Sequence, residues 1–335
     1  MIPELEQIEI LIAEMGPKVR SKILAHSQMG DIRLPIYKLT FGSEDPCAPT
    51  IGFIGGVHGL ERIGAQVCLS LLKSFAELML WDEGTKKALQ NIRVFFIPVV
   101  NPIGILKRTR SNPQGVDLMR NSPTEADAAA RWVGGQRYSA KLPWYRGDIG
   151  QAMQPESMAL VAAVEEEIFK SKTAITLDFH SGFGWQDQIW FPYAKTKKPY
   201  PGLPEAHAFK TLFDRTYPHH FYKIEPQALN YTTHGDLWDH LYDEYLQRGP
   251  RGGNYLPLCV EMGSWTWLKK NPLQIFRLHG HFNPLKSHRM KRTLRRHNTL
   301  FDFMIKAAQS PQAWAQLSES QKIQHTNRAK ELWYV

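Results

Sequence analysis

His58 and Glu61 stand three residues apart on a short glycine-rich segment, and their types and spacing point to metal chemistry. Two glycines precede His58 and a third follows it, so the backbone can turn sharply there. An imidazole and a carboxylate on such a turn can converge on one ion. A catalytic zinc site has three protein ligands and an open fourth position. The pair therefore indicates two thirds of such a site.

A third ligand is available at a distance in the sequence. An apolar run at residues 50–54 ends just before His58, and a second apolar run at residues 174–180 ends in His180. Both runs are predicted to be buried strands. Ligands and catalytic groups in open α/β sheets gather outside the carboxyl ends of strands. We therefore expect His58, Glu61 and His180 to bind one zinc ion.

Glu261 lies near the end of a further apolar run, residues 256–262, which is predicted to be a strand. A carboxylate in such a run is costly unless it is used or paired. We favour a general base that acts on a metal-activated water. A salt-bridged residue at a sheet edge is the alternative.

Three arginines, Arg108, Arg110 and Arg120, follow the apolar run at residues 92–100 in a segment rich in Gly, Pro and Asn. A guanidinium group can hold a carboxylate through two parallel hydrogen bonds. These arginines are therefore candidate anion-binding groups, although a solvated loop charge is the default for any one of them.

Strands and helices alternate along the chain, which predicts a single α/β domain. We expect a mixed, mostly parallel twisted sheet with helices on both faces. The predicted strands are residues 32–41, 50–54, 92–100, 174–180, 188–193 and 255–262. The predicted helices are residues 61–80, 155–172, 203–217, 235–247 and 282–308. The expected division is an N-terminal helical lead-in at 1–30, a catalytic domain at 31–310 and a C-terminal extension at 311–335.

The composition is that of a globular protein, with 335 residues, 43% hydrophobic and 22% charged. The longest apolar runs, such as residues 94–100, are too short to span a bilayer. The acidic N-terminus lacks the pattern of a signal peptide. Three widely spaced cysteines suit a reducing compartment. We therefore expect a cytoplasmic protein without a membrane partner.

The net charge of +9 is concentrated at residues 286–297, which hold six cations and no acid. A solvated helix face is the expected interpretation, and an acidic partner is the alternative. Nucleic acid is not expected, because no aromatic side chains interleave this run. Only one metal ion is expected, since the paired histidines at 219–220 and at 279 and 281 have no evident third ligand.

Five motifs together resemble the zinc metallocarboxypeptidase family, which is typified by carboxypeptidase A. The resemblance spans residues 51–263 and depends on the order and approximate spacing of the motifs, because each alone is unspecific. The motifs are His-Gly-Leu-Glu at 58–61, Asn-Pro-Ile-Gly at 101–104, Gly-Val-Asp-Leu-Met-Arg-Asn at 115–121, His-Ser-Gly at 180–182 and Glu-Met-Gly at 261–263.

The resemblance implies a role for each candidate residue. It implies that His58, Glu61 and His180 are the zinc ligands and that Glu261 is the general base and proton shuttle. It implies that Asp117 orients a zinc-bound histidine.

The resemblance also implies how the substrate is held. Arg110, with Arg108 as the fallback, is similar to the arginine that polarises the scissile carbonyl. Arg120 is similar to the arginine that binds the free carboxylate of the substrate. Tyr231 is a plausible counterpart of the family's mobile tyrosine.

Met119 departs from the family pattern, which usually has an asparagine there that helps to bind the carboxylate. A thioether cannot donate a hydrogen bond. Either Asn121 compensates, or the substrate presents its anionic group differently. The implied activity is zinc-dependent hydrolysis of an amide next to a free carboxylate, with a peptide or a small amide as substrate. A deacylase of small N-acyl amino acids, a muropeptide amidase and a binding protein on a decayed scaffold remain alternatives.

Overall fold

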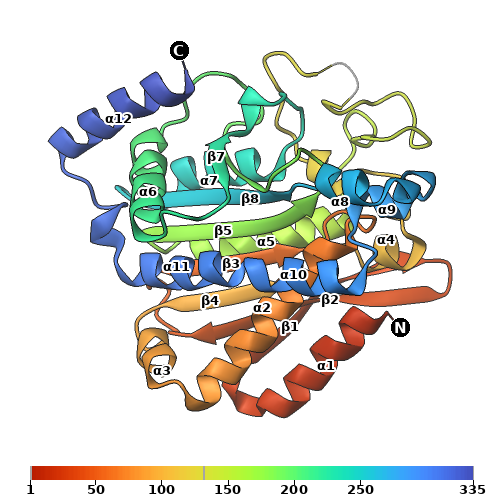
Figure 1. Ribbon diagram of the computed structural model, residues 1–335, viewed down its shortest axis with the longest axis horizontal. Coiled ribbons are helices and arrows are strands. Elements are labelled where there is room, and N and C mark those ends of the chain that lie inside the picture. The colour runs from red at the N-terminus through yellow and green to blue at the C-terminus, as the bar shows by residue number, and fades with distance from the viewer. Residues whose placement is uncertain (1, 131–132, 335) are drawn as a thin grey trace.

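The computed structural model describes residues 2–130 and 133–334 and contains a sheet of eight strands in the order β1-β2-β4-β3-β5-β8-β6-β7 (Figure 1). The strands β4, β3, β5 and β8 pair in parallel, as do β6 and β7, whereas β1, β2 and β6 pair antiparallel with β2, β4 and β8 respectively. This confirms the predicted mixed, mostly parallel sheet. The strands are β1 Arg20–Met29, β2 Ile32–Gly42, β3 Thr50–Gly55, β4 Arg93–Ile97, β5 Thr173–Ser181, β6 Gln188–Phe191, β7 Lys223–Pro226 and β8 Asn254–Met262.

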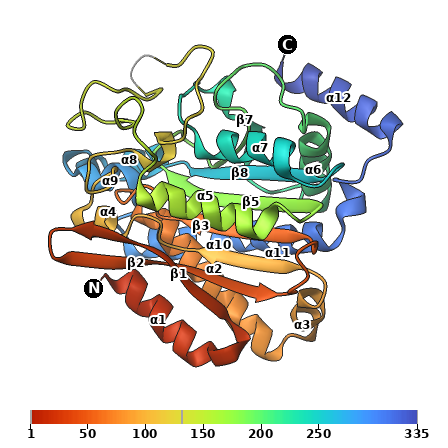
Figure 2. The same cartoon turned by 180° about the vertical axis from the view of Figure 1, so that it is seen from behind.

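Helices cover both faces of this sheet, as predicted. Helices α2, α10 and α11 lie across one face (Figure 1), and α5 and α7 lie across the other (Figure 2). The α-helices are α1 Pro3–Met15, α2 Arg62–Trp81, α3 Glu83–Leu89, α4 Pro102–Lys107, α5 Pro155–Ile168, α6 Leu203–Thr216, α7 Leu237–Arg248, α8 Trp265–Lys270, α9 Leu278–Phe282, α10 Ser287–Arg296, α11 Asn298–Gln309 and α12 Glu319–Trp333. The short 3₁₀ helices are η1 Gly16–Lys18, η2 Leu118–Arg120, η3 Gln227–Leu229, η4 Pro272–Phe276 and η5 Pro311–Ala313.

The two central strands β3 and β5 are buried at every residue, which explains their continuous apolar sequence. Their parallel register places Gly55, the last residue of β3, opposite Phe179. On the other side of β5, His180 pairs directly with Glu261 of β8. The sheet therefore brings the carboxyl ends of three strands, and the motifs that follow them, to one edge.

Helix α2 approaches β5 without an intervening side chain. A Cβ atom on Gly64, in the first turns of α2, would fall 2.1 Å from the carbonyl oxygen of Phe179. Gly59, in the turn before α2, makes a similar approach to the backbone of Gly104, where a Cβ atom would fall 1.9 Å from the carbonyl carbon. These positions require glycine because the backbones themselves are in contact.

Two predicted elements were wrong. The helical lead-in ends at Met15, and residues 20–29 form the edge strand β1, whose mostly exposed polar side chains give no apolar alternation. The single helix predicted at 282–308 is instead two helices, α10 and α11, and the first of them begins only at Ser287. Helices α10 and α11 are divided at His297, which is fully buried and bonded through Nδ1 to the Tyr222 hydroxyl at 2.8 Å. The boundaries at 30 and 310 stay predictions, and residues 1 and 335 lie outside the described residues.

Helix α2 is the one described helix that is long and apolar enough to cross a membrane by length and composition. In this structure 56% of the most apolar 18-residue stretch of the helix is buried inside the protein. The helix packs along β3 and β5, so its apolar character follows from its place in the core.

Candidate metal centre and active site

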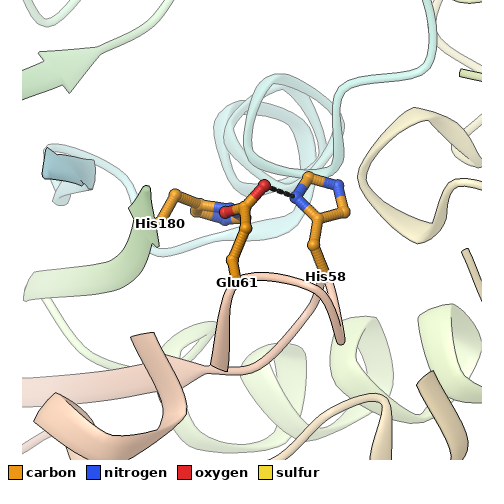
Figure 3. A group of neighbouring side chains, drawn as sticks. All are labelled: His58, Glu61 and His180. Carbon is orange, nitrogen blue, oxygen red and sulfur yellow. Dashed lines mark hydrogen bonds and ion pairs between the residues drawn. The ribbon is translucent and has the colours of Figure 1, made fainter. Parts of the chain in front are cut away.

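His58, Glu61 and His180 converge on one point (Figure 3). Their ligand atoms all lie within 4.8 Å of one another, and all three residues are buried. The Nδ1 atom of His58 is 2.9 Å from one carboxylate oxygen of Glu61, and Nδ1 of His180 is 3.1 Å from the other. Two histidines and a glutamate are one of the ligand sets that catalytic zinc uses, so these residues fit the predicted ion.

The ends of β3 and β5 position these ligands. After β3 ends at Gly55, the chain turns through Gly56, whose φ is +65°, and Glu61 is the N-cap residue of α2. His180 is the second-last residue of β5. The backbone N–H of Ser181 also donates to Glu61 at 3.0 Å. The turn and the strand are thus tied together at the carboxylate.

A second carboxylate holds each imidazole from behind. Nε2 of His58 lies 2.9 Å from Asp117, and Nε2 of His180 lies 2.7 Å from Asp178. The indole N–H of Trp238 donates to Asp178 at 3.1 Å. With both Nε2 atoms engaged, both Nδ1 atoms are directed to the common point, which is the arrangement that orients metal-bound histidines.

Sequence reasoning identified Asp117 but missed Asp178. The available signal was an acid two residues before His180 in an otherwise apolar strand, since residues i and i+2 share one face of a strand. Asp178 is fully buried, where an unpaired carboxylate would be costly.

The charges at the centre favour an anionic Glu61 and Asp117. Burial raises the pKa of both carboxyl groups, but the neighbouring cationic groups outweigh it. His58 and His180 lower the pKa of Glu61 well below its usual range, and Arg110 and His58 do the same for the pKa of Asp117. The site therefore carries negative charge where a cation would bind.

Arg110 lies inside this network. Its Nη1 group donates to Glu61 at 3.0 Å, and its Nε group donates to Asp117 at 2.8 Å. These bonds use two of the five N–H groups of a guanidinium, so the Nη2 side stays available to a substrate. Arg108, the fallback residue, is exposed at the C-cap of α4 and lines the cleft described below, as Arg110 does.

Glu261 is nine-tenths buried beside the metal ligands, across the sheet from His180. Its Oε2 atom has no hydrogen-bond partner among the described residues. Burial, together with the charge of Glu61, raises the pKa of Glu261 to about 8. A structural carboxylate would be paired, so this unpartnered oxygen favours a group that acts on a bound molecule.

A cleft of about 590 Å³ opens over these groups. Glu61, Arg110 and Glu261 are among the residues that line it, and the surrounding walls come from several loops and from α9. These wall residues are Leu60, Arg108, Trp144, Gly182, Phe183, Tyr231 and Phe282. A much smaller void of about 30 Å³ is lined by two of the metal ligands, His58 and His180, and shares Arg110 and Glu261 with the cleft.

The smaller void is lined by Arg120, Met119 and Tyr231, among others. Tyr231 also lines the larger cleft. Arg120 is buried, and its Nη2 group lies 3.4 Å from the Tyr231 hydroxyl. Asn121 is not among the described residues that line either cavity. Its amide donates to the Arg146 carbonyl at 2.9 Å and accepts from the Gln154 backbone at 2.5 Å. The structure therefore brings Arg120 and Tyr231 to the site but leaves Asn121 outside it.

Comparisons with known proteins agree with this geometry. The sequence model of the family described as zinc carboxypeptidase matches residues 13–245. That range includes His58, Glu61 and His180 and stops before Glu261. Carboxypeptidase SOL1 of Arabidopsis thaliana is 23% identical over 227 residues, which are 67% of this chain and 42% of the relative. The chain thus spans less than half the length of that relative.

Solved structures show the same fold. Bovine thrombin-activatable fibrinolysis inhibitor, solved in complex with tick carboxypeptidase inhibitor, matches with a TM-score of 0.62 and 17% identity over 91% of this chain and 95% of that one. Carboxypeptidase A from Helicoverpa armigera matches with a TM-score of 0.59 and 17% identity over 88% of this chain and 71% of that one. Because the family model covers most of the sequence, this chain belongs to the zinc carboxypeptidase family, a family of hydrolases.

Proposed function

We propose that this protein hydrolyses the amide bond next to a free carboxylate, with one zinc ion held by His58, Glu61 and His180. The observation that carries the proposal is the convergence of these three ligands beside the unpartnered carboxylate oxygen of Glu261. When bound, zinc would polarise the scissile carbonyl and lower the pKa of a water molecule to about 7.

In this proposal Glu261 moves the protons. Its carboxylate accepts a proton from the attacking water and returns that proton to the amine that leaves. A general acid or base works best when its pKa is near the working pH, and in the metal-free protein burial and Glu61 raise the pKa of Glu261 from its usual range toward that pH. The position of Glu261 on β8 opposite His180 keeps it beside the ligands while its own oxygen stays free.

Arg110 and Arg120 act on two different groups of the substrate, which are the scissile carbonyl and the free carboxylate. The available Nη2 side of Arg110 faces the negative charge that develops on the carbonyl oxygen, and this charge exists only during reaction. Arg120 binds the free carboxylate, with the Tyr231 hydroxyl 3.4 Å from its Nη2 group. Because Met119 cannot donate a hydrogen bond, Arg120 supplies most of that recognition.

The alternatives have less support. A binding protein on a decayed scaffold requires a lost ligand or base, and the described residues hold all four groups. A deacylase of small N-acyl amino acids would be favoured by a small C-terminal domain that closes the site. Among the described residues, helix α12 packs along α6 and contributes no side chain to the lining of the cleft.

The direct test compares a set of short peptides with a free C-terminal carboxylate and the same peptides amidated at that end. We expect cleavage of the free acids and poor cleavage of the amides. Activity should be lost on chelation and recovered when zinc is added back. Equal cleavage of both sets would rule out a carboxypeptidase and favour another amide hydrolase, such as a muropeptide amidase. Activity that persists after complete metal removal would rule out the zinc mechanism.

A further inference from the structure

Residues 262–301 form the most one-sided stretch of charge in the protein. They contain no aspartate or glutamate, and Asp302 is the first acid that follows them. The cations of this stretch are Lys269, Lys270, Arg277, Lys286, Arg289, Lys291, Arg292, Arg295 and Arg296. Arg296 is used inside the fold, where it pairs with the buried Asp187 at 2.6 Å. Most of the others are exposed, so the stretch gives the protein a strongly positive surface.

Bulky apolar side chains project from the middle of this positive surface. On the short helix η4, Leu273 is 74% exposed, Ile275 is 55% exposed and Phe276 is 84% exposed. Single exposed apolar residues are ordinary, but three within four consecutive positions form a patch that calls for a partner. Trp185, which is 60% exposed, lies near it on a different loop.

Contacts join Trp185 to α8, and α8 packs against η4, which carries the three exposed apolar side chains. The Trp185 and Trp265 rings are 5.6 Å apart, and the Lys269 ammonium lies 6.0 Å from the Trp185 ring. Arg289 of α10 donates to the carbonyl of Lys270 at 3.1 Å, which holds α10 against the end of α8. We call this the basic apolar surface. It consists of Trp185, Trp265, Lys269, Lys270, Leu273, Ile275, Phe276 and Arg277, with the exposed cations of α10 beside it.

We propose that the basic apolar surface docks on the surface of an anionic phospholipid bilayer. Cations that surround projecting leucine, isoleucine and phenylalanine side chains match such a partner, because lipid phosphates attract the charges and the acyl boundary accepts the apolar side chains. A nucleic acid would use the cations but would leave Leu273 and Ile275 without a role. Helix η4 has five residues, so it would enter only the interface of the bilayer. Such docking needs no long exposed apolar helix of the kind that spans a membrane.

The basic apolar surface borders the proposed active site. The Trp265 indole donates to the carbonyl of Gly182 at 3.2 Å, and the Phe183 and Trp265 rings are 5.5 Å apart. Gly182, Phe183 and Phe282 also line the cleft. In Figure 1, α8 and α9 lie together at the same end of the sheet as α4. Docking would therefore bring the mouth of the cleft close to the bilayer.

The test is sedimentation of the full chain with phosphatidylcholine vesicles, with and without phosphatidylglycerol. We expect binding only when phosphatidylglycerol is present, and weaker binding as salt is added. The triple variant Lys269→Ala, Lys270→Ala, Arg277→Ala should lower the partition coefficient by about a hundredfold, since each cation near the surface contributes roughly fivefold. The control variant Lys197→Ala, Lys198→Ala removes exposed lysines elsewhere and should bind like the wild type.

The apolar part of the proposal needs its own variant. Leu273→Ser, Ile275→Ser, Phe276→Ser should also abolish binding while the cations remain. The matched control is Trp81→Ser, which removes a side chain that is 67% exposed at the C-terminal end of α2. Because these side chains are exposed, the variants should keep the wild-type circular dichroism spectrum and Tm.

A measurement on the unmodified protein guards against variants that misfold. Lipids brominated near the headgroup should quench part of the tryptophan fluorescence of the wild type when Trp185 and Trp265 reach the interface. Failure to bind anionic vesicles at low salt would overturn the proposal. So would equal binding to a soluble polyanion such as heparin that does not depend on residues 273–276. Neither readout uses catalysis, so these outcomes are independent of the proposed hydrolysis.

Discussion

The carboxylate of Asp178 lies 2.7 Å from Nε2 of His180, two residues further along the same strand. Side chains at i and i+2 of a strand point to the same face, so the backbone of β5 itself presets the orientation of this imidazole. His58 reaches the same result differently, because its partner Asp117 comes from a loop 59 residues away. Both histidines are thus oriented by a hydrogen bond between Nε2 and an aspartate, but one aspartate comes from a loop and the other from the same strand.

We expect Asp178→Asn to weaken zinc binding by roughly 10- to 100-fold, the usual effect of losing a partner of a metal-bound histidine. The amide removes the negative charge but keeps the volume, so the fold should survive. Competition with a chromogenic chelator would measure the affinity. Asp214→Asn is the matched control, because it alters an aspartate that bonds to a histidine outside the site, His220. Unchanged affinity in Asp178→Asn would show that β5 alone orients His180.

Glu261→Gln should retain one zinc ion per chain while kcat falls by roughly a hundred- to ten-thousand-fold, the range for loss of a general acid or base. The glutamine keeps the shape of the side chain but cannot accept the proton of the attacking water. Metal analysis and steady-state kinetics on one preparation would test both statements. Glu205→Gln, which changes a partly buried glutamate on α6, should keep both properties. Near-normal kcat in Glu261→Gln would remove Glu261 from the mechanism.

Arg120→Ala should raise KM for free-acid peptides by roughly ten- to a hundredfold, because a hydrogen bond to a charged group contributes about 1.5–3 kcal/mol. The variant should also discriminate less between free-acid and amidated peptides, since it loses the group that recognises the carboxylate. Arg251→Ala, in an exposed loop, is the control. A variant at position 120 that keeps its preference for free acids would place carboxylate recognition elsewhere.

Arg110→Ala should behave differently and lower kcat at saturating substrate, because its partner charge forms only in the transition state. Its bonds to Glu61 and Asp117 add a second effect, which is weaker zinc binding. Kinetics at a series of zinc concentrations would separate the two effects. If saturating zinc restored the full kcat, the role of Arg110 would be confined to holding Glu61 and Asp117.

The C-terminal helix α12 should make stability sensitive to acid. Nδ1 of His207 on α6 lies 2.8 Å from Nδ1 of His325 on α12, so one of the two atoms must be unprotonated to accept the bond. Burial, together with His325, Lys210 and Arg328, lowers the pKa of His207 to about 4, while Asp214 opposes this shift. The unfolded chain therefore binds more protons than the folded chain between about pH 6.5 and about pH 4.

Stability from this pair is fully present above that window and is lost as the pH falls through it. Thermal unfolding at a series of pH values should show a decline in Tm that is smaller in the His325→Gln variant, because the amide oxygen at position 325 can accept a hydrogen bond from His207 at any pH. His288→Gln, at an exposed position on α10, should keep the wild-type decline. A decline that does not change in His325→Gln would assign the acid sensitivity to other groups.

The sequence predicted the features that are local. Strands β3 and β5 are continuously apolar because both of their faces are buried, and the ligands follow them directly. The fold and the His58–Glu61–His180 cluster could therefore be predicted before any coordinates. By contrast, the hydrogen bonds of Arg110 depend on the path of an irregular loop, which no periodic pattern in the sequence predicts.

Other features were hidden because they depend on tertiary contacts. The division between α10 and α11 follows from the buried bond of His297 to Tyr222, which lies 75 residues earlier in the chain. Asn121 was a reasonable candidate from its place in the motif, but a nearby carbonyl and a backbone N–H already occupy its amide. Such competition among polar groups is decided only when the chain is folded.

Because Gly64 has no side chain, α2 can lie close enough to β5 for Glu61 and His180 to reach the same point. Glu61 lies three residues before Gly64, and His180 directly follows Phe179, whose carbonyl oxygen would be 2.1 Å from a Cβ atom at position 64. An added methyl group must push α2 away from β5, because the atom it meets belongs to the backbone and cannot rotate away. This movement would increase the distance between Glu61 and His180. Gly64→Ala should therefore act as a metal-binding lesion at a position that never touches the ion. The spacing of the ligands is in this sense set by how closely a helix can approach a strand.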